Sequence, residues 1–171
     1  MQRWGWLLLA MCVVAAGCDD NGTAPTNPPL VFTALLSPAN EVPPIGNAES
    51  VARGAVQITL NATRDSSGAI TAATADFHVQ LTGLPAGTVY TGAHIHPGVA
   101  GINGPVIVNT GLSTGPPVSF ASNTAIWDFR GIAVPAATAQ LIVNNPSAYY
   151  FNVHTVSNPG GVARGQLART Q

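Results

Sequence analysis

The stretch "ADFHVQL", Ala75 to Leu81, shows the pattern that decides the fold. Its apolar residues Phe77, Val79 and Leu81 alternate with polar ones, so they share one face of an extended chain. The segment "VQITL", Val56 to Leu60, has the same two-residue period. The chain also contains 18 glycines and 14 prolines, residues that favour turns. The sequence therefore predicts strands that each bury one face and are joined by many turns.

The same pattern, followed along the chain, predicts an all-β antiparallel sandwich of seven to eight strands, immunoglobulin-like or superoxide-dismutase-like. We expect strands at residues 31–36, 51–60, 69–81, 89–96, 106–109, 118–129, 148–155 and 161–168. One short helix is expected near residues 135–145, because Pro135 can open a helix and Pro146 must end it. The segment "NPGG", Asn158 to Gly161, places Pro and Gly at the central positions of a predicted type II turn.

The N-terminal segment "MQRWGWLLLAMCVVAAGC" is similar to a bacterial lipoprotein signal. One arginine precedes an apolar run that is too short to span a bilayer, and small residues follow it. The resemblance implies a signal peptide at residues 1–17, cleavage before Cys18, and lipid attachment to Cys18. The alternative is an ordinary signal peptide that is cut elsewhere. Residues 18–29 are polar and proline-rich, which predicts a flexible tether before a domain at residues 30–171.

The charge pattern limits the classes of partner. Only 8% of the residues are charged, lysine is absent, the formal net charge is -1, and there is no basic run. Nucleic acid and anionic membrane surfaces are therefore not expected partners. We expect an exported protein, lipid-anchored in the bacterial cell envelope and facing the periplasm or the cell surface. It would contact the membrane through its N-terminal lipid only, and its ligand would be an unknown protein or small molecule.

Three of the four histidines lie in two short stretches. In "TGAHIHPG", His94 and His96 point to the same face of a strand, with Cα atoms about 6.5 to 7 Å apart. In "YYFNVHTV", His154 lies on the face opposite the apolar residues. If the two strands are neighbours, three imidazoles can meet and hold zinc or copper, with a fourth position left open. Glu41, in "ANEVPP", is the carboxylate that we place nearest to them.

A metal-free interpretation remains open, because histidines at the end of a sandwich often only hydrogen-bond to loops. The fourth histidine, His78, lies between polar residues of a strand and is expected to be solvated without a special role. A small metalloenzyme, hydrolytic or redox, that uses the histidines with Glu41 is a further alternative. The sequence has no nucleophile elbow and no glycine-rich phosphate loop, so other catalytic classes have no support.

Four segments together resemble the CHRD domain, a family named for animal chordin: "LLSPANEVPP", "RGAVQITL", "LTGLPAGTVYTGAHIHPGVAGINGPVIVNTG" and "YYFNVHTVSNPGGVARGQL". The motif order is an E-V-P-P loop, His-x-His followed by N-G-P with Asn103, then V-H-T and P-G-G leading to R-G-Q with Arg164. The resemblance runs from about Phe32 to Leu167. It implies a β-sandwich module without established enzymatic activity, so we expect a binding or structural module rather than an enzyme.

The chain departs from this family in one respect, because Val162 and Ala163 stand after P-G-G, where the family often has an acidic residue. Arg164 is therefore expected to pair with Glu41 or to hydrogen-bond loop carbonyls. The segment "HIH" is also similar to the H-x-H of copper/zinc superoxide dismutases. That family needs more histidines, an aspartate and a disulfide, which four histidines and the single cysteine of the mature chain cannot supply.

Overall fold

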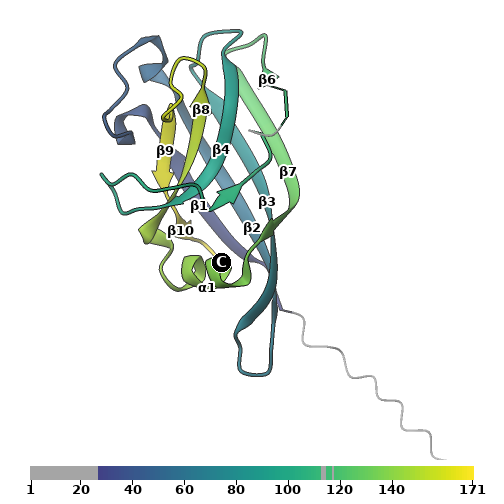
Figure 1. The fold of residues 1–171 in the computed structure, drawn as a ribbon. Helices are drawn as coiled ribbons and strands as arrows, with labels where there is room; N and C mark the ends of the chain where they lie inside the picture. The colour runs from purple at the N-terminus through teal and green to yellow at the C-terminus, as the bar shows by residue number, and fades with distance from the viewer. Residues whose placement is uncertain (1–26, 113–114, 117) are drawn as a thin grey trace, which may run out of the picture.

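The computed structural model describes residues 27–112, 115–116 and 118–171 (Figure 1). It contains two antiparallel β-sheets and one short α-helix, so the predicted all-β sandwich is confirmed. The predicted signal segment 1–17 and Cys18 lie outside the described residues, as does the tether up to residue 26. Within the described part of the chain, no helix has the length and apolar character needed to cross a membrane.

The first sheet is built around the two long strands that the alternation predicted. Its spatial order is β10 (Ala168–Arg169), β1 (Leu30–Leu36), β2 (Arg53–Arg64), β3 (Ile70–Thr82) and β7 (Thr124–Val134). In the β2–β3 pair, Val56 lies opposite Val79 and Ile58 opposite Phe77. All four side chains are buried, because the pairing places both apolar sets on the face that meets the second sheet.

The second sheet carries the histidines. Its order is β5 (Val108–Asn109), β4 (Val89–Pro97), β8 (Tyr149–Thr155) and β9 (Ala163–Gln166), and β6 (Val118–Ser119) also pairs with β4. Figure 1 shows β4, β8 and β9 in front of the first sheet. Ile95, Phe151 and Val153 face the core, but the polar residues of the other face of β4 and β8 are buried as well. That outer face lies under loops, which gives the sheet a second, polar interior.

The helix α1 (Ala136–Asn144) follows Pro135 and ends before Pro146, as predicted. Ala139 and Ile142 are its buried residues, and Figure 1 shows the helix across one end of the sandwich. Three short 3₁₀ helices complete the elements of the described chain: η1 (Pro38–Asn40), η2 (Ala48–Val51) and η3 (Pro146–Ala148).

The described chain has ten strands because two predicted strands each pass from one sheet to the other. The segment 118–129 divides into β6, which pairs with β4, and β7, which pairs with β3. Between them, the carbonyls of Phe120 and Asn123 accept hydrogen bonds from Gly87 and Gly83 of the β3–β4 turn. The segment 161–168 likewise divides at Leu167 into β9 and β10. Between β6 and β7 the exposed residues 121–123 interrupt the strand, and the inward positions change phase from Val118 and Phe120 to Ala125 and Trp127.

Two local predictions are corrected. Val51 ends the 3₁₀ helix η2 instead of opening a strand, because the side chain of Asn47 caps that helix by accepting from the Glu49 N–H at 3.0 Å. The turn at Asn158 to Gly161 closes with a backbone hydrogen bond of 3.1 Å, but it is not type II. Type II requires a positive φ at Gly160, whereas the positive φ, 132°, is at Gly161.

Candidate metal centre

The pairing of β4 with β8 determines which side chains meet on the outer face of the second sheet. Gly92 lies opposite His154, His94 opposite Asn152, and His96 opposite Tyr150. In an antiparallel pair, opposite residues point to the same side. The two histidine strands are therefore neighbours, which meets the condition for three converging imidazoles and places all three rings on one face.

The three rings converge. One ring nitrogen from each of His94, His96 and His154 lies within 4.8 Å of the corresponding nitrogens of the other two. The ring centroids are 4.9 Å apart for His94 and His154, 5.7 Å for His94 and His96, and 5.9 Å for His96 and His154. All three side chains are buried, with 6% to 9% of their surface exposed. Side chains this close can share one metal ion as ligands.

A glycine makes room for this arrangement. A Cβ atom at Gly92 would lie 2.7 Å from Cε1 of His94 and 3.5 Å from Cδ2 of His154. The two imidazoles thus occupy space above β4 that the side chain of any larger residue at position 92 would fill. The sequence offered no sign of this role, because an isolated glycine in a strand more often marks a bulge or a bend.

Backbone carbonyls fix the orientation of two of the rings. Nδ1 of His96 lies 3.0 Å from the Gly104 carbonyl oxygen, and Nδ1 of His154 lies 3.0 Å from the Pro159 carbonyl oxygen. A carbonyl only accepts, so each Nδ1 carries the proton and each Nε2 presents its lone pair. Both Nε2 atoms are buried, and no hydrogen-bond partner reaches them from the described residues. Metal-ligating histidines usually show this pattern, a carbonyl on one nitrogen and the metal on the other.

Burial keeps the three imidazoles neutral. Loss of hydration, followed by the charges of His154 and His96, lowers the pKa of His94 to about 4. Loss of hydration is also the main cause that lowers the pKa values of His96 and His154. A neutral imidazole is the form that binds a metal ion, so the site needs no deprotonation near neutral pH.

The pKa shifts predict how the stability of the metal-free protein depends on pH. Between pH 6.5 and about 4, unfolded histidines bind protons that folded His94 does not, so the free energy of unfolding falls as the pH falls. The lowered pKa values of His96 and His154 act in the same direction. The share of His94 alone is about 3 kcal/mol. Urea unfolding of chelator-treated protein at a series of pH values measures this loss.

Glu41 changes the pH dependence of the free energy of unfolding in the opposite direction, because burial raises its pKa to about 7. Its contribution to stability is complete below pH 4.5 and is lost as the pH rises through about 7. Three histidines outweigh one glutamate between pH 4.5 and 6.5, so stability should still rise with pH there. A His94→Gln variant should show a shallower rise, and a flat or falling profile in the wild type would contradict the assignment.

The structure places Glu41 beside the histidines but not among them. Its side chain hydrogen-bonds to that of Asn152, and it is absent from the group of three converging ligands. Gly161 covers this contact, since a Cβ there would lie 2.3 Å from Nδ2 of Asn152 and 2.8 Å from Oε2 of Glu41. Asn152, which lies opposite His94 in the sheet, is therefore the neighbour of the histidines that Glu41 contacts. The two-residue period places Asn152 on the histidine face, but nothing in the sequence indicates its contact with Glu41.

Arg164 hydrogen-bonds to loop oxygens, one of its two expected alternatives. Its side chain, 1% exposed, donates to the Asn40 carbonyl, to Oδ1 of Asn103 at 2.8 Å and to the Ile102 carbonyl at 3.4 Å. No ion pair within 4.0 Å joins it to Glu41, although its charge lowers the pKa of Glu41 against the larger effect of burial. Arg164 thus binds the segment between β1 and β2 to the segment after β4.

A stack of rings links this arginine to the metal centre. The guanidinium carbon of Arg164 lies 4.5 Å from the centroid of the Tyr150 ring. The Tyr150 ring is stacked on His96, with centroids 4.9 Å apart and planes 6° from parallel. The Tyr150 hydroxyl also accepts from the Gly104 N–H at 3.1 Å, next to the carbonyl that holds His96. Asn103, which accepts from Arg164, also donates to the Val42 carbonyl at 3.0 Å.

His78 lies apart from this group, on the exposed face of the first sheet. Its Nδ1 is 3.0 Å from Oδ1 of Asp128, and both side chains are about half exposed. The position of His78 on the polar face of its strand agrees with the sequence pattern, but the aspartate partner comes from β7 and was not foreseen.

The comparisons with known proteins agree with the motif order along the chain. No curated protein sequence matches this one. A family model described as the CHRD domain matches residues 32–167, which include most of β1, all of β2 to β9 and every residue of the metal centre. The chain therefore belongs to the CHRD domain family.

Proposed function

We propose that this CHRD domain is a binding module for one transition-metal ion, zinc or copper, held by His94, His96 and His154. The observation that carries the proposal is the pair of buried Nε2 atoms, on His96 and His154, that lack hydrogen-bond partners among the described residues. A buried polar atom without a partner is costly, and a metal ion would satisfy both lone pairs at once. Zinc and copper both accept neutral imidazole ligands.

Three protein ligands leave a coordination position for water or a small ligand. The metalloenzyme alternative relied on Glu41 as a further ligand or base, but Glu41 contacts Asn152 and lies outside the ligand group. We therefore assign no catalytic step to the site. A domain in which the histidines only stiffen loops is the outcome that the experiment below must exclude.

The experiment is a metal count on protein produced without a histidine tag. The chelator-treated protein is dialysed against Zn²⁺ or Cu²⁺ and then against metal-free buffer, and bound metal is measured by mass spectrometry. We expect one ion per chain for at least one of the two metals. Protein that retains neither metal would overturn the proposal and leave an adhesion or interaction domain.

We also propose that the domain is exported and anchored in the bacterial cell envelope by lipid on Cys18. The apolar run and the small residues before Cys18 support this, as does the polar, proline-rich segment after it. The membrane would then be contacted through the lipid alone, and the binding partner would be a protein or small molecule yet to be identified.

Replacing Cys18 with serine is expected to move the protein from the membrane fraction to the soluble fraction. Serine lacks the thiol that carries the lipid, while the rest of the signal is unchanged. Fractionation of cells followed by immunoblotting measures the shift. Cys12→Ser, inside the apolar run, is the matched control and should stay with the membranes. Equal membrane retention of the Cys18→Ser protein would rule out this anchor.

A further inference from the structure

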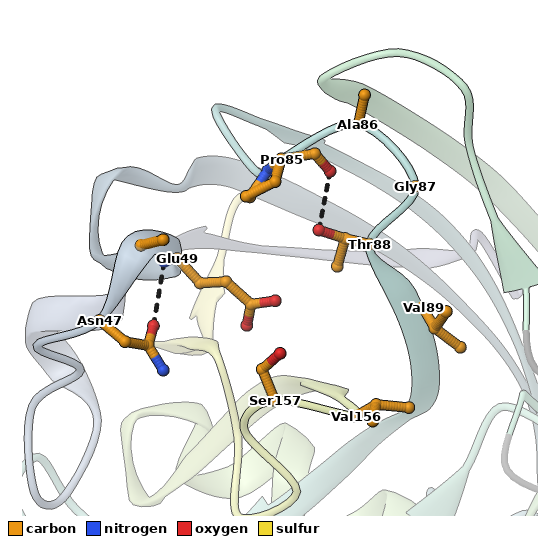
Figure 2. A pocket seen from close by; sticks show the side chains of 10 residues that line it. Asn47, Glu49, Pro85, Ala86, Gly87, Thr88, Val89, Val156 and Ser157 are labelled. Carbon is orange, nitrogen blue, oxygen red and sulfur yellow. Dashed lines mark hydrogen bonds between the residues drawn. The ribbon is translucent and has the colours of Figure 1, made fainter.

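A second site lies at the end of the sandwich where three chain segments meet (Figure 2). Its walls come from η2, from the turn between β3 and β4, and from the residues after β8. They line an open pocket of about 430 Å³. Glu49 is the only ionisable side chain among the lining residues, which are otherwise neutral and largely apolar.

Glu49 is a buried carboxylate in which one oxygen accepts hydrogen bonds and the other has no hydrogen-bond partner among the described residues. The side chain is 5% exposed. Oε2 accepts from the Thr155 hydroxyl at 2.7 Å and from Nδ2 of Asn158. No hydrogen bond reaches Oε1 from the described residues, and no arginine or histidine among them lies within 4.0 Å of the carboxylate. A buried negative charge without a counter-charge is unfavourable, so this position favours a cationic ligand.

The charge of Glu49 also affects a buried tyrosine. Burial, and then the negative charge of Glu49, raises the pKa of Tyr90 to about 12. The chain contains no lysine, and the arginines form no ion pair with Glu49 among the described residues. Within the described residues Glu49 thus has no counter-charge, which a cation from solution would supply.

The geometry of the oxygens indicates which cation fits. Figure 2 shows the Glu49 carboxylate, the Thr88 hydroxyl and the Ser157 hydroxyl around the same space. The Thr88 hydroxyl donates to the Pro85 carbonyl at 2.8 Å, which leaves its lone pairs free to accept. We propose that this pocket binds a small primary amine in its ammonium form, with Glu49 as the counter-ion. A primary ammonium has three N–H donors for these three oxygens.

The remaining walls suit the body of such a ligand. Pro85, Ala86, Val89 and Val156 present apolar surface that an alkyl chain can cover. A calcium ion is a poorer fit, because it takes six to eight oxygen ligands and this pocket offers one open carboxylate oxygen with two hydroxyls. The proposal is independent of the metal centre, since it uses none of the three histidines.

The test is a titration of chelator-treated, isotope-labelled protein with n-butylammonium near neutral pH, followed by NMR. We expect saturable binding, with shifts in residues 47–49, 85–89 and 155–158. Glu49→Gln keeps the oxygen that accepts from Thr155 and Asn158 but removes the charge. It should weaken binding by about 10-fold or more. The matched control is Asp128→Asn, which changes an exposed carboxylate on β7 of the first sheet. This variant should bind n-butylammonium as the wild type does.

A second variant covers the case in which Glu49→Gln fails to fold. Ser157 is exposed at the pocket mouth, so Ser157→Phe should fill the pocket with the Glu49 charge retained, and it should also abolish binding. Tetramethylammonium, which has no N–H donors, should bind at least about 10-fold more weakly than n-butylammonium. The proposal is overturned if the wild type shows no saturable binding, if neither variant weakens it, or if Ca²⁺ alone binds this pocket in preference to the amine.

Discussion

Replacing His154 with alanine is expected to lower the affinity of the protein for zinc by about 100-fold or more. Groups that merely orient metal ligands already contribute 10- to 100-fold to affinity, and this change removes a ligand itself. The two remaining histidines, His94 and His96, would hold the ion from one strand only. A competition titration against a chromogenic chelator measures the two affinities.

The matched control is His78→Ala, which removes a histidine from the exposed face of the first sheet. This variant should bind zinc as tightly as the wild type, and so exclude adventitious binding by surface histidines. Saturating zinc, at 100 times the dissociation constant, should also stabilise the wild type by about 2.7 kcal/mol, whereas His154→Ala should gain much less at the same concentration. Equal zinc affinities for wild type and His154→Ala would place the metal elsewhere.

The sequence was informative about the metal centre because strands have a fixed period. The two-residue repeat alone places His94 and His96 on one face, and it places His154 on the face opposite Phe151 and Val153. It does not say which strands are neighbours. The centre depends on the pairing of β4 with β8, which are more than fifty residues apart in the chain, and that pairing is decided by the whole sandwich.

The loops were less predictable, because their positions depend on long-range contacts. Glu41 was expected near the histidines on the basis of its proline-rich loop, but the structure joins it to Asn152. The sequence gives no sign of the role of Glu49, because the pattern around it predicts the approach to a strand and not a 3₁₀ helix. Its burial follows from Thr155 and Asn158, over one hundred residues later in the chain. A lone acidic residue carries no local pattern that could reveal such partners.

The expected number of strands differed for a related reason. The expected strand 118–129 is interrupted by the exposed residues 121–123, and its alternation changes phase there. Which sheet each part joins is given by the hydrogen-bond partners, which change between β6 and β7 and between β9 and β10. The class of fold was therefore predictable from composition and period, whereas the corners of the sandwich were not.

Replacing Arg164 with alanine is expected to lower the free energy of unfolding by about 3 to 5 kcal/mol, the usual cost of removing one member of a buried, hydrogen-bonded charge network. The change removes the donors that hold the Asn40 carbonyl and Oδ1 of Asn103. It also leaves a cavity beside the Tyr150 ring. Thermal unfolding should show a midpoint lower by about 10 °C for a domain of this size.

The loss should extend to the metal centre, because Arg164 secures the segment that orients His96. Asn103, its hydrogen-bond partner, directly precedes Gly104, whose carbonyl accepts from Nδ1 of His96. We therefore expect Arg164→Ala to weaken zinc binding by about 10-fold, as removal of an orienting group does. Arg169→Ala, an exposed arginine on β10, is the control and should change stability by less than about 0.5 kcal/mol.

Arg164→Lys separates charge from geometry. Lysine restores the positive charge but lacks the planar fork that reaches Asn40, Ile102 and Asn103 together. If the fork matters, the lysine variant should recover only part of the lost stability and part of the zinc affinity. If Arg164→Lys recovers the full stability and zinc affinity, charge alone supports the loops. If Arg164→Ala is as stable as the wild type, this buried network does not hold the loops over the histidines.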